Sequence, residues 1–114
     1  IKTIITVDCG TLSNEAVDFA NKKNVSTIIL DHHQANLSFP KALGIINPTR
    51  IDDNSKLKYL CATSIVFFFL LALNKKLKDT NWYKENNIKE PEMFEESNLE
   101  EDFEIPAFLR RQKN

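Results

Sequence analysis

Two groups of residues in this chain could take part in metal chemistry. The first is Asp8, and the second is the consecutive triplet Asp31, His32 and His33. Carboxylate oxygens together with one or two imidazole nitrogens suit Mn²⁺ or Mg²⁺, with some preference for nitrogen. Two such ions can stabilise the attacking and leaving oxygens of a phosphodiester at the same time. These residues therefore predict metal-assisted hydrolysis.

Each group also has an explanation that involves no ligand. An aspartate after a strand often only caps a helix or a turn, and a histidine pair on a loop is more often solvated than metal-bound. For Asp8 alone the two explanations are evenly balanced. For Asp31, His32 and His33 the ligand explanation is favoured, because three residues of suitable types stand together directly after an apolar run. Gly10 supplies a turn under either explanation.

Three apolar runs should form the strands that position these residues. The runs at 3–8, 25–30 and 43–47 are typical of buried strands, although the third is weaker. Ser13 can cap a helix between the first two. A strand, helix, strand order predicts parallel strands with a right-handed crossover and apolar cover on both faces. Because ligands bind at the carboxyl ends of such strands, we expect Asp8 and the histidines to face one cleft.

A long buried helix is predicted over residues 60–78, with lysines in its last turns, where the helix dipole favours them. Its apolar part is about fourteen residues long, whereas a membrane-spanning helix needs about 20. Another short helix should begin at Trp82 and Tyr83, with Asp79 or Thr80 as its cap. Because the apolar part of the helix over residues 60–78 is too short to span a bilayer, no membrane span is expected.

Length, charge and cysteine content limit the class of protein. A chain of 114 residues with 42% hydrophobic content can form one small domain. The formal net charge of -1 leaves no overall basic excess, so any contact with DNA must be local. Cys9 and Cys61 match neither a redox motif nor a zinc-ligand spacing, which predicts free thiols in the cytoplasm. No signal peptide is recognisable, and a start at Ile1 suggests a fragment.

The composition changes near Pro91. Residues 1–91 carry twelve Lys or Arg against nine Asp or Glu, a net of +3. Residues 92–114 carry three against seven, a net of -4, and the two parts give the formal -1 of the whole chain. An acidic run with few strongly apolar residues cannot build a core. We therefore predict a flexible acidic tail over residues 92–114.

Four segments resemble the RecJ-type single-strand DNA exonucleases of the Asp-His-His (DHH) phosphoesterase family, in the same order and with similar gaps. They are ITVDCG (5–10), ILDHHQ (29–34), IINPTR (45–50) and CATSIVFFFLLAL (61–73). The likeness covers about residues 1–91. It implies an α/β fold, namely a partial DHH domain with a parallel sheet built on a βαβ core and a long buried helix.

The resemblance also implies roles for the candidate residues. Asp8 matches the family's second acidic motif, a metal ligand that often bridges two ions, and His32 matches its metal-binding histidine. Asp31 would orient that histidine or hold metal-bound water, since such carboxylates fix the tautomer of ligating imidazoles. His33 would lie close to the scissile phosphate. The implied activity is Mn²⁺- or Mg²⁺-dependent hydrolysis of single-stranded DNA from the 5′ end, in DNA repair and recombination.

The chain departs from the family pattern in what it lacks. The family's first motif, a strand ending in closely spaced aspartates, should precede Ile1, and its last metal-binding aspartate should follow Trp82 and Tyr83. A separate C-terminal domain is also missing. We therefore expect a fragment that is inactive alone. Two alternatives stay open: a DHH phosphoesterase acting on oligonucleotides or small phosphorylated molecules, and a non-catalytic gene remnant or interaction peptide.

The end of the chain resembles a different protein. Residues 99–114, LEEDFEIPAFLRRQKN, are similar to the C-terminal peptide of the tubulin-like bacterial division protein FtsZ. Ile105, Phe108 and Leu109 have the i, i+3, i+4 spacing of a docking helix, and Pro106 suits its first position. This resemblance implies binding to division-ring proteins. The alternative is a solvated, frayed terminus.

Overall fold

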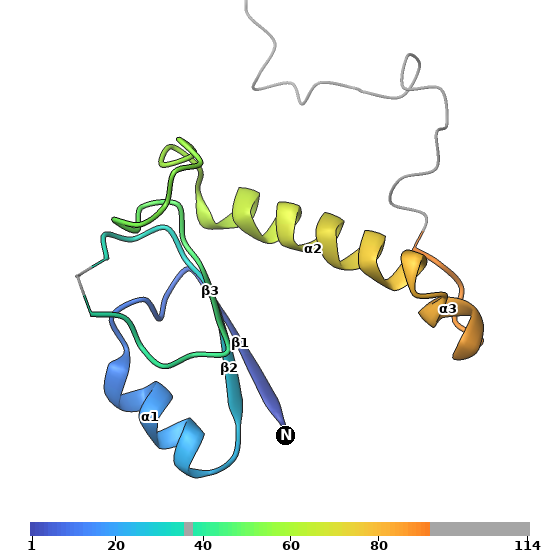
Figure 1. The fold of residues 1–114 in the computed structure, drawn as a ribbon, viewed down its shortest axis with the longest axis horizontal. Helices are drawn as coiled ribbons and strands as arrows, with labels where there is room; N and C mark the ends of the chain where they lie inside the picture. The colour runs from blue at the N-terminus through green and yellow to red at the C-terminus, as the bar shows by residue number, and fades with distance from the viewer. Residues whose placement is uncertain (36–37, 92–114) are drawn as a thin grey trace, which may run out of the picture. The chain divides into compact units, whose positions relative to one another are not determined.

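The computed structural model describes residues 1–35 and 38–91 of the chain (Figure 1). The chain divides into two compact units, one formed by Ile1–Thr80 and one that begins at Asn81. The first unit contains β1 (Thr3–Val7), α1 (Asn14–Lys22), β2 (Ser26–Leu30), β3 (Gly44–Ile46) and α2 (Ala62–Asp79). The second contains α3 (Trp82–Glu85).

The three strands form one parallel sheet in the order β1, β2, β3 (Figure 1). Val7 is the register partner of Leu30, which in turn is the partner of Ile46, so all three strands end at the same level. The predicted α/β fold and its βαβ core are therefore confirmed. This alignment brings the loops that follow the three strands together at one edge of the sheet.

The core is small and lies around the central strand. Ile29 and Leu30 of β2 are buried, as are Val17 of α1 and Ala62 and Ile65 of α2. A buried apolar side chain is worth about 1.5–3 kcal/mol relative to an exposed one. Because few side chains of the first unit reach this degree of burial, β2 carries a large share of its stability.

The expectation that both faces of every strand are covered is wrong for β1. Ile4, Ile5 and Val7 are all exposed, and β1 is an edge strand whose outer side has no neighbour among the described residues. The burial of a strand depends on what lies beside it, and an apolar run does not specify how many neighbours it has.

The predicted long helix is confirmed as α2. Lysines stand in its last turn as the dipole favours, and no helix in the described part of the chain could cross a bilayer. The expectation that this helix is buried is wrong for most of its length, because only Ala62 and Ile65 in its N-terminal part are buried and an apolar run does not specify what packs against it. Phe67, Phe68 and Leu70 are exposed.

The helix ends differ from the capping predictions in two places. Ser13 occupies the N-cap position of α1, but its side chain makes no capping hydrogen bond. The predicted caps of α3 are wrong: Asn81, in a left-handed conformation with φ of 55°, takes that position. Thr80 instead closes α2, and its hydroxyl donates to the carbonyl of Lys76 at 3.0 Å. Asparagine tolerates the left-handed region better than most residues, which explains the choice.

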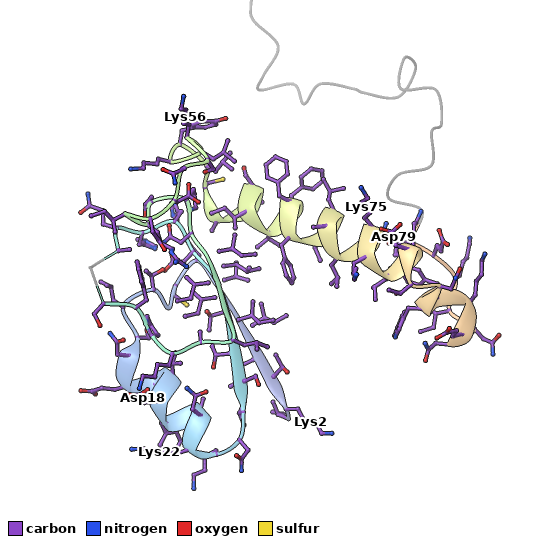
Figure 2. The ribbon with its side chains drawn as sticks, viewed as in Figure 1. Lys2, Asp18, Lys22, Lys56, Lys75 and Asp79 are labelled. Carbon is purple, nitrogen blue, oxygen red and sulfur yellow. The ribbon has the colours of Figure 1, made fainter. Side chains whose placement is uncertain are left out.

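Charged side chains lie mainly on the outside of these elements (Figure 2). Lys2, Asp18 and Lys22 are exposed and point away from the ribbon of the first unit. Asp31 is the exception among the described residues, with a relative exposure of 1%. An ionised carboxylate is costly to bury unless it is well hydrogen-bonded, so its surroundings need an explanation.

Candidate metal centre

Asp8 and the Asp-His-His triplet meet at the carboxyl edge of the sheet. The backbone amide of Asp8 donates to the carbonyl of Leu30 at 2.9 Å, which continues the pairing of β1 with β2 by one residue. The residues that follow β1 and β2 therefore leave the sheet side by side. Here Asp8 Oδ1 lies 3.1 Å from Nε2 of His32. The predicted proximity of Asp8 and His32 is confirmed.

The backbone turns sharply at Asp8. Its φ is 61°, in the left-handed region that only a few per cent of non-glycine residues adopt, among which aspartate is enriched. Gly10 follows with a φ of 116°. The pair ends β1 abruptly, so that the Asp8 carboxylate turns toward His32. Strained backbone of this kind persists where the surrounding structure holds it in place.

Asp31 is the most constrained group of the site. Its Oδ2 accepts a hydrogen bond from the backbone amide of Thr11 at 3.0 Å. Its Oδ1 accepts from the backbone amide of His32 at 2.8 Å and lies 2.7 Å from Nδ1 of His33. The ring that Asp31 orients is thus that of His33, while His32 contacts Asp31 only through its backbone.

These contacts keep Asp31 ionised. Burial alone would raise the pKa of Asp31, but the hydrogen bonds from His33, Thr11 and His32 outweigh it and hold that pKa well below its usual range. The hydrogen bond to Asp31 and its negative charge raise the pKa of His33. A carboxylate can only accept, so Nδ1 of His33 must carry the hydrogen. In the neutral ring, Nε2 of His33 is then the nitrogen that can bind a metal.

The donor atoms fit a partial metal site. Asp8, His32 and His33 each offer one ligand atom, and these atoms all lie within 4.8 Å of one another. One carboxylate and two imidazoles form a mixed oxygen and nitrogen set, which Mn²⁺ accepts more readily than Mg²⁺. The side chains of Asp8 and His33 are each 60% exposed, so the other coordination positions face solvent. Sequence reasoning had placed His33 beside the phosphate; the structure brings it into the same cluster as Asp8 and His32.

Three further polar residues support the site and were given no role by sequence reasoning. Thr11 and Asn47 are buried, and Asn47 and Thr49 both bond to the carbonyl of His33. The IINPTR segment contains two of them, but their contacts join loops that are far apart in the sequence.

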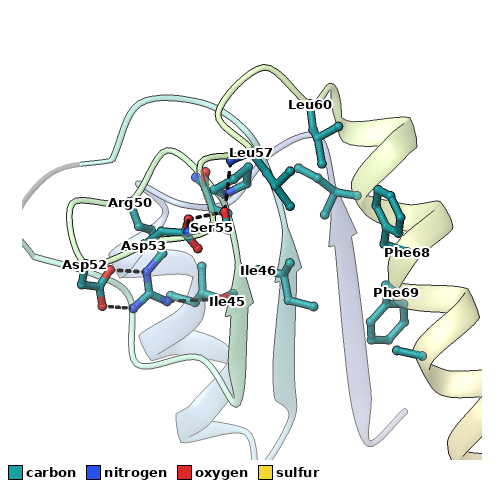
Figure 3. A pocket seen from close by; sticks show the side chains of 14 residues that line it. Ile45, Ile46, Arg50, Asp52, Asp53, Ser55, Leu57, Leu60, Phe68 and Phe69 are labelled. Atoms are coloured by element: carbon teal, nitrogen blue, oxygen red, sulfur yellow. Dashed lines mark hydrogen bonds and ion pairs between the residues drawn. The ribbon is translucent and has the colours of Figure 1, made fainter.

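A separate pocket of about 450 Å³ lies between β3 and α2 (Figure 3). Its wall is mostly apolar, with Ile46 on one side and Phe68 on the other, and none of the three candidate ligands lines it. At its rim, Nε of Arg50 donates to Asp52 at 2.8 Å. Cζ of Arg50 also lies over the ring of Phe39, 4.5 Å from its centroid, and this cation–π contact helps to hold the loop after β3 in place.

The predicted docking residues Ile105, Phe108 and Leu109 lie outside the described residues, as does the whole segment 92–114. The flexible tail and its binding to division-ring proteins stay predictions.

The sequence of this chain is similar to part of several known proteins. The single-stranded-DNA-specific exonuclease RecJ of Escherichia coli is 37% identical over 92 residues, which cover 81% of this chain and 16% of that protein. Those of Dickeya dadantii and Salmonella typhimurium are 32% and 36% identical over the same coverage. The chain thus spans about one sixth of the length of these relatives. No solved structure gives a significant match. Residues 2–96 match the model described as the DHH family, N-terminal domain, and the chain therefore belongs to the DHH family.

Proposed function

We propose that this chain carries part of the active site of a metal-dependent exonuclease that hydrolyses single-stranded DNA from its 5′ end. The observation that supports this proposal best is the convergence of Asp8, His32 and His33, whose ligand atoms lie within 4.8 Å of one another. The relatives that match most of this chain are named as single-strand DNA exonucleases. Their name supports the substrate, and the donor set supports the metal.

Each residue has a distinct part in this proposal. Asp8 and His32 hold the ion, which when bound would activate water and stabilise charge on the phosphate. Asp31 holds Nδ1 of His33, so that Nε2 is presented to the ion or to a phosphate oxygen. The side chains of Asp8 and His33 are each 60% exposed, so a substrate phosphate can reach the cluster from solvent.

The chain alone should bind metal weakly and hydrolyse nothing. Three ligand atoms supply only half of an octahedral shell, and two-metal catalysis needs both ions in fixed positions. We expect a Mn²⁺ dissociation constant on the order of 10⁻⁴ M or weaker, in the range of loosely held sites. Electron paramagnetic resonance of free Mn²⁺ measures it. His32→Ala should remove the residual binding, whereas Asn54→Ala, an exposed change in another loop, should not.

Two results would contradict the proposal. If His32→Ala and Asp8→Asn bound Mn²⁺ as the unchanged chain does, the cluster would not be a metal site. If the chain degraded 5′-labelled single-stranded DNA in Mn²⁺ by itself, and His32→Ala abolished this activity, the site would be complete. The expectation of a fragment that is inactive alone would then be wrong.

The alternative substrate is an oligonucleotide or a small phosphorylated molecule. It has less support, because the curated relatives that match most of the chain are named as exonucleases of single-stranded DNA. Restoring a RecJ-length protein around this chain and comparing long single strands with dinucleotides would decide. Faster cleavage of dinucleotides would favour the alternative.

A further inference from the structure

The side chain of Asn47 joins two loops of the site to a third. Asn47 follows β3 directly and has a relative exposure of 3%. Its Nδ2 donates one hydrogen to Oγ1 of Thr11 and the other to the carbonyl of His33, both at 2.9 Å. Its Oδ1 accepts from the backbone amide of Thr49 at 2.9 Å. Both hydrogens of one amide group are therefore used, each on a different loop.

These contacts complete a closed ring of hydrogen bonds. Thr11 donates its backbone amide to Asp31, Asp31 accepts from His33, the carbonyl of His33 accepts from Asn47, and Asn47 donates to Thr11. Thr11, Asp31 and Asn47 are nearly inaccessible to solvent. Buried hydrogen bonds that are all satisfied hold their members in one arrangement.

The closed ring of hydrogen bonds explains how ligand candidates on separate loops keep their spacing. Asp8 is three residues before Thr11, on the loop after β1, and His33 is on the loop after β2. Among the described residues of these loops, the backbone hydrogen bond of Asp8 to Leu30 is the last one that continues the strand pairing. Asn47 stands outside both and bonds to both. An aspartate would lack the two donors, and an alanine would leave Thr11 Oγ1 and the His33 carbonyl without this partner.

We propose that Asn47 is a positioning residue of the metal centre, which holds the β1 and β2 loops so that Asp8 and His33 lie at ligand distance from one ion. Asn47 contacts neither the ion nor the substrate and acts through Thr11 and His33. This inference rests on the proposed function for its metal, but the positioning of the His33 ring is independent of it.

The test compares Mn²⁺ binding by the full 114-residue chain and its variants, at a temperature well below each unfolding midpoint. Residues that orient metal ligands typically contribute about 10–100-fold to metal affinity, so we expect Asn47→Ala to weaken Mn²⁺ binding by about tenfold or more. Thr11→Val is close in volume and keeps the backbone amide of Thr11, but it removes the hydroxyl that accepts from Asn47 and that also bonds to Asp31. It should fold and weaken binding by a smaller factor.

The matched control is Asn21→Ala. Asn21 also donates its side-chain amide to a backbone carbonyl, that of Lys41 at 2.9 Å, but it is exposed and lies on α1. Its loss should leave Mn²⁺ affinity unchanged. If Asn47→Ala and Thr11→Val, shown to be folded by amide NMR, bound Mn²⁺ as tightly as the unchanged chain, the positioning role would be refuted while the metal centre stood.

A second readout works without metal. The ¹⁵N shifts of the His33 ring, recorded at a pH above its raised pKa so that the ring is neutral, should report hydrogen on Nδ1 in the unchanged chain, held there by Asp31. In Asn47→Ala we expect a shift toward hydrogen on Nε2, the form that free histidine favours; a merely structural asparagine would leave the ring unchanged. If the unchanged chain bound no Mn²⁺ but this shift occurred, the positioning would stand and the proposed function would fail. If the ¹⁵N shifts of the His33 imidazole were the same in Asn47→Ala as in the unchanged chain, the positioning role of Asn47 would be refuted.

Discussion

At the scale of single residues, the site depends on backbone conformations that few side chains accept. Asp8 and Gly10 both have positive φ, and together they end β1 and redirect the chain toward α1. Asp31 then accepts the Thr11 amide, which comes directly after Gly10. The turn is thus as much a part of the site as the ligand candidates.

Gly10→Ala should destabilise the chain more than Gly44→Ala. A Cβ on Gly10 would lie 2.8 Å from Oγ1 of Thr6 and 3.2 Å from Cγ2 of Ile29, at a φ of 116°. Strain of this kind costs on the order of 1–3 kcal/mol. A Cβ on Gly44 meets nothing within 4 Å. Urea unfolding of both variants measures the difference, and equal losses would mean that the turn can relax.

The Asp31 and His33 pair predicts how stability changes with pH in the metal-free chain. The pKa of Asp31 is lowered in the folded state, so its contribution is present above its unfolded pKa of about 3.9 and is lost as the pH falls through the folded value. The pKa of His33 is raised, so its contribution is present below about 6.5 and is lost as the pH rises through the folded value. Both contributions are therefore present between about pH 4 and 6.5.

Unfolding in EDTA from pH 3 to 8 tests this window. Asp31→Asn should flatten the decline below about pH 4. Asp18→Asn, which removes an exposed carboxylate of α1, should leave that decline unchanged. A decline of the same steepness in Asp31→Asn would show that other groups cause it.

At the scale of elements, much of the fold follows from local patterns. The apolar runs that end in Asp8 and Asp31 predicted two parallel strands, and the shared edge of such strands predicted that their last residues meet. The contacts of Asn47 could not be predicted in the same way, because they join residues 14 and 36 positions away in the sequence. The exposure of β1 was missed because an apolar run does not reveal whether another strand lies beside it.

The contrast between β1 and β2 predicts unequal responses to truncation. Ile29 of β2 is 0% exposed, and Ile29→Ala should cost about 2–5 kcal/mol, since it leaves a cavity in the small core. Ile5 of β1 is 51% exposed, and Ile5→Ala should cost about 1 kcal/mol or less. Both remove the same atoms, and urea unfolding compares them directly. A similar loss for Ile5→Ala would mean that β1 is covered in solution.

At the scale of the whole molecule, a nearly neutral chain presents much apolar surface. The formal net charge is -1, and Ile5, Phe67 and Phe68 are all exposed in the first unit. Large exposed apolar patches mark surfaces that associate, and a net charge close to zero does little to oppose association. The pocket between β3 and α2 adds to this surface (Figure 3).

The chain should therefore self-associate as its concentration rises, and Phe68→Glu should reduce the association. Phe68 is 52% exposed on α2, so a glutamate there removes apolar surface and adds charge at little cost in stability. Thr63→Glu adds the same charge to an exposed position of the same helix without removing an aromatic ring. Sedimentation velocity over a range of concentrations separates the two effects. If both variants dissociate equally, net charge controls association. If only Phe68→Glu dissociates, the apolar face of α2 is the contact surface. A chain that stays monomeric at every concentration would contradict the prediction.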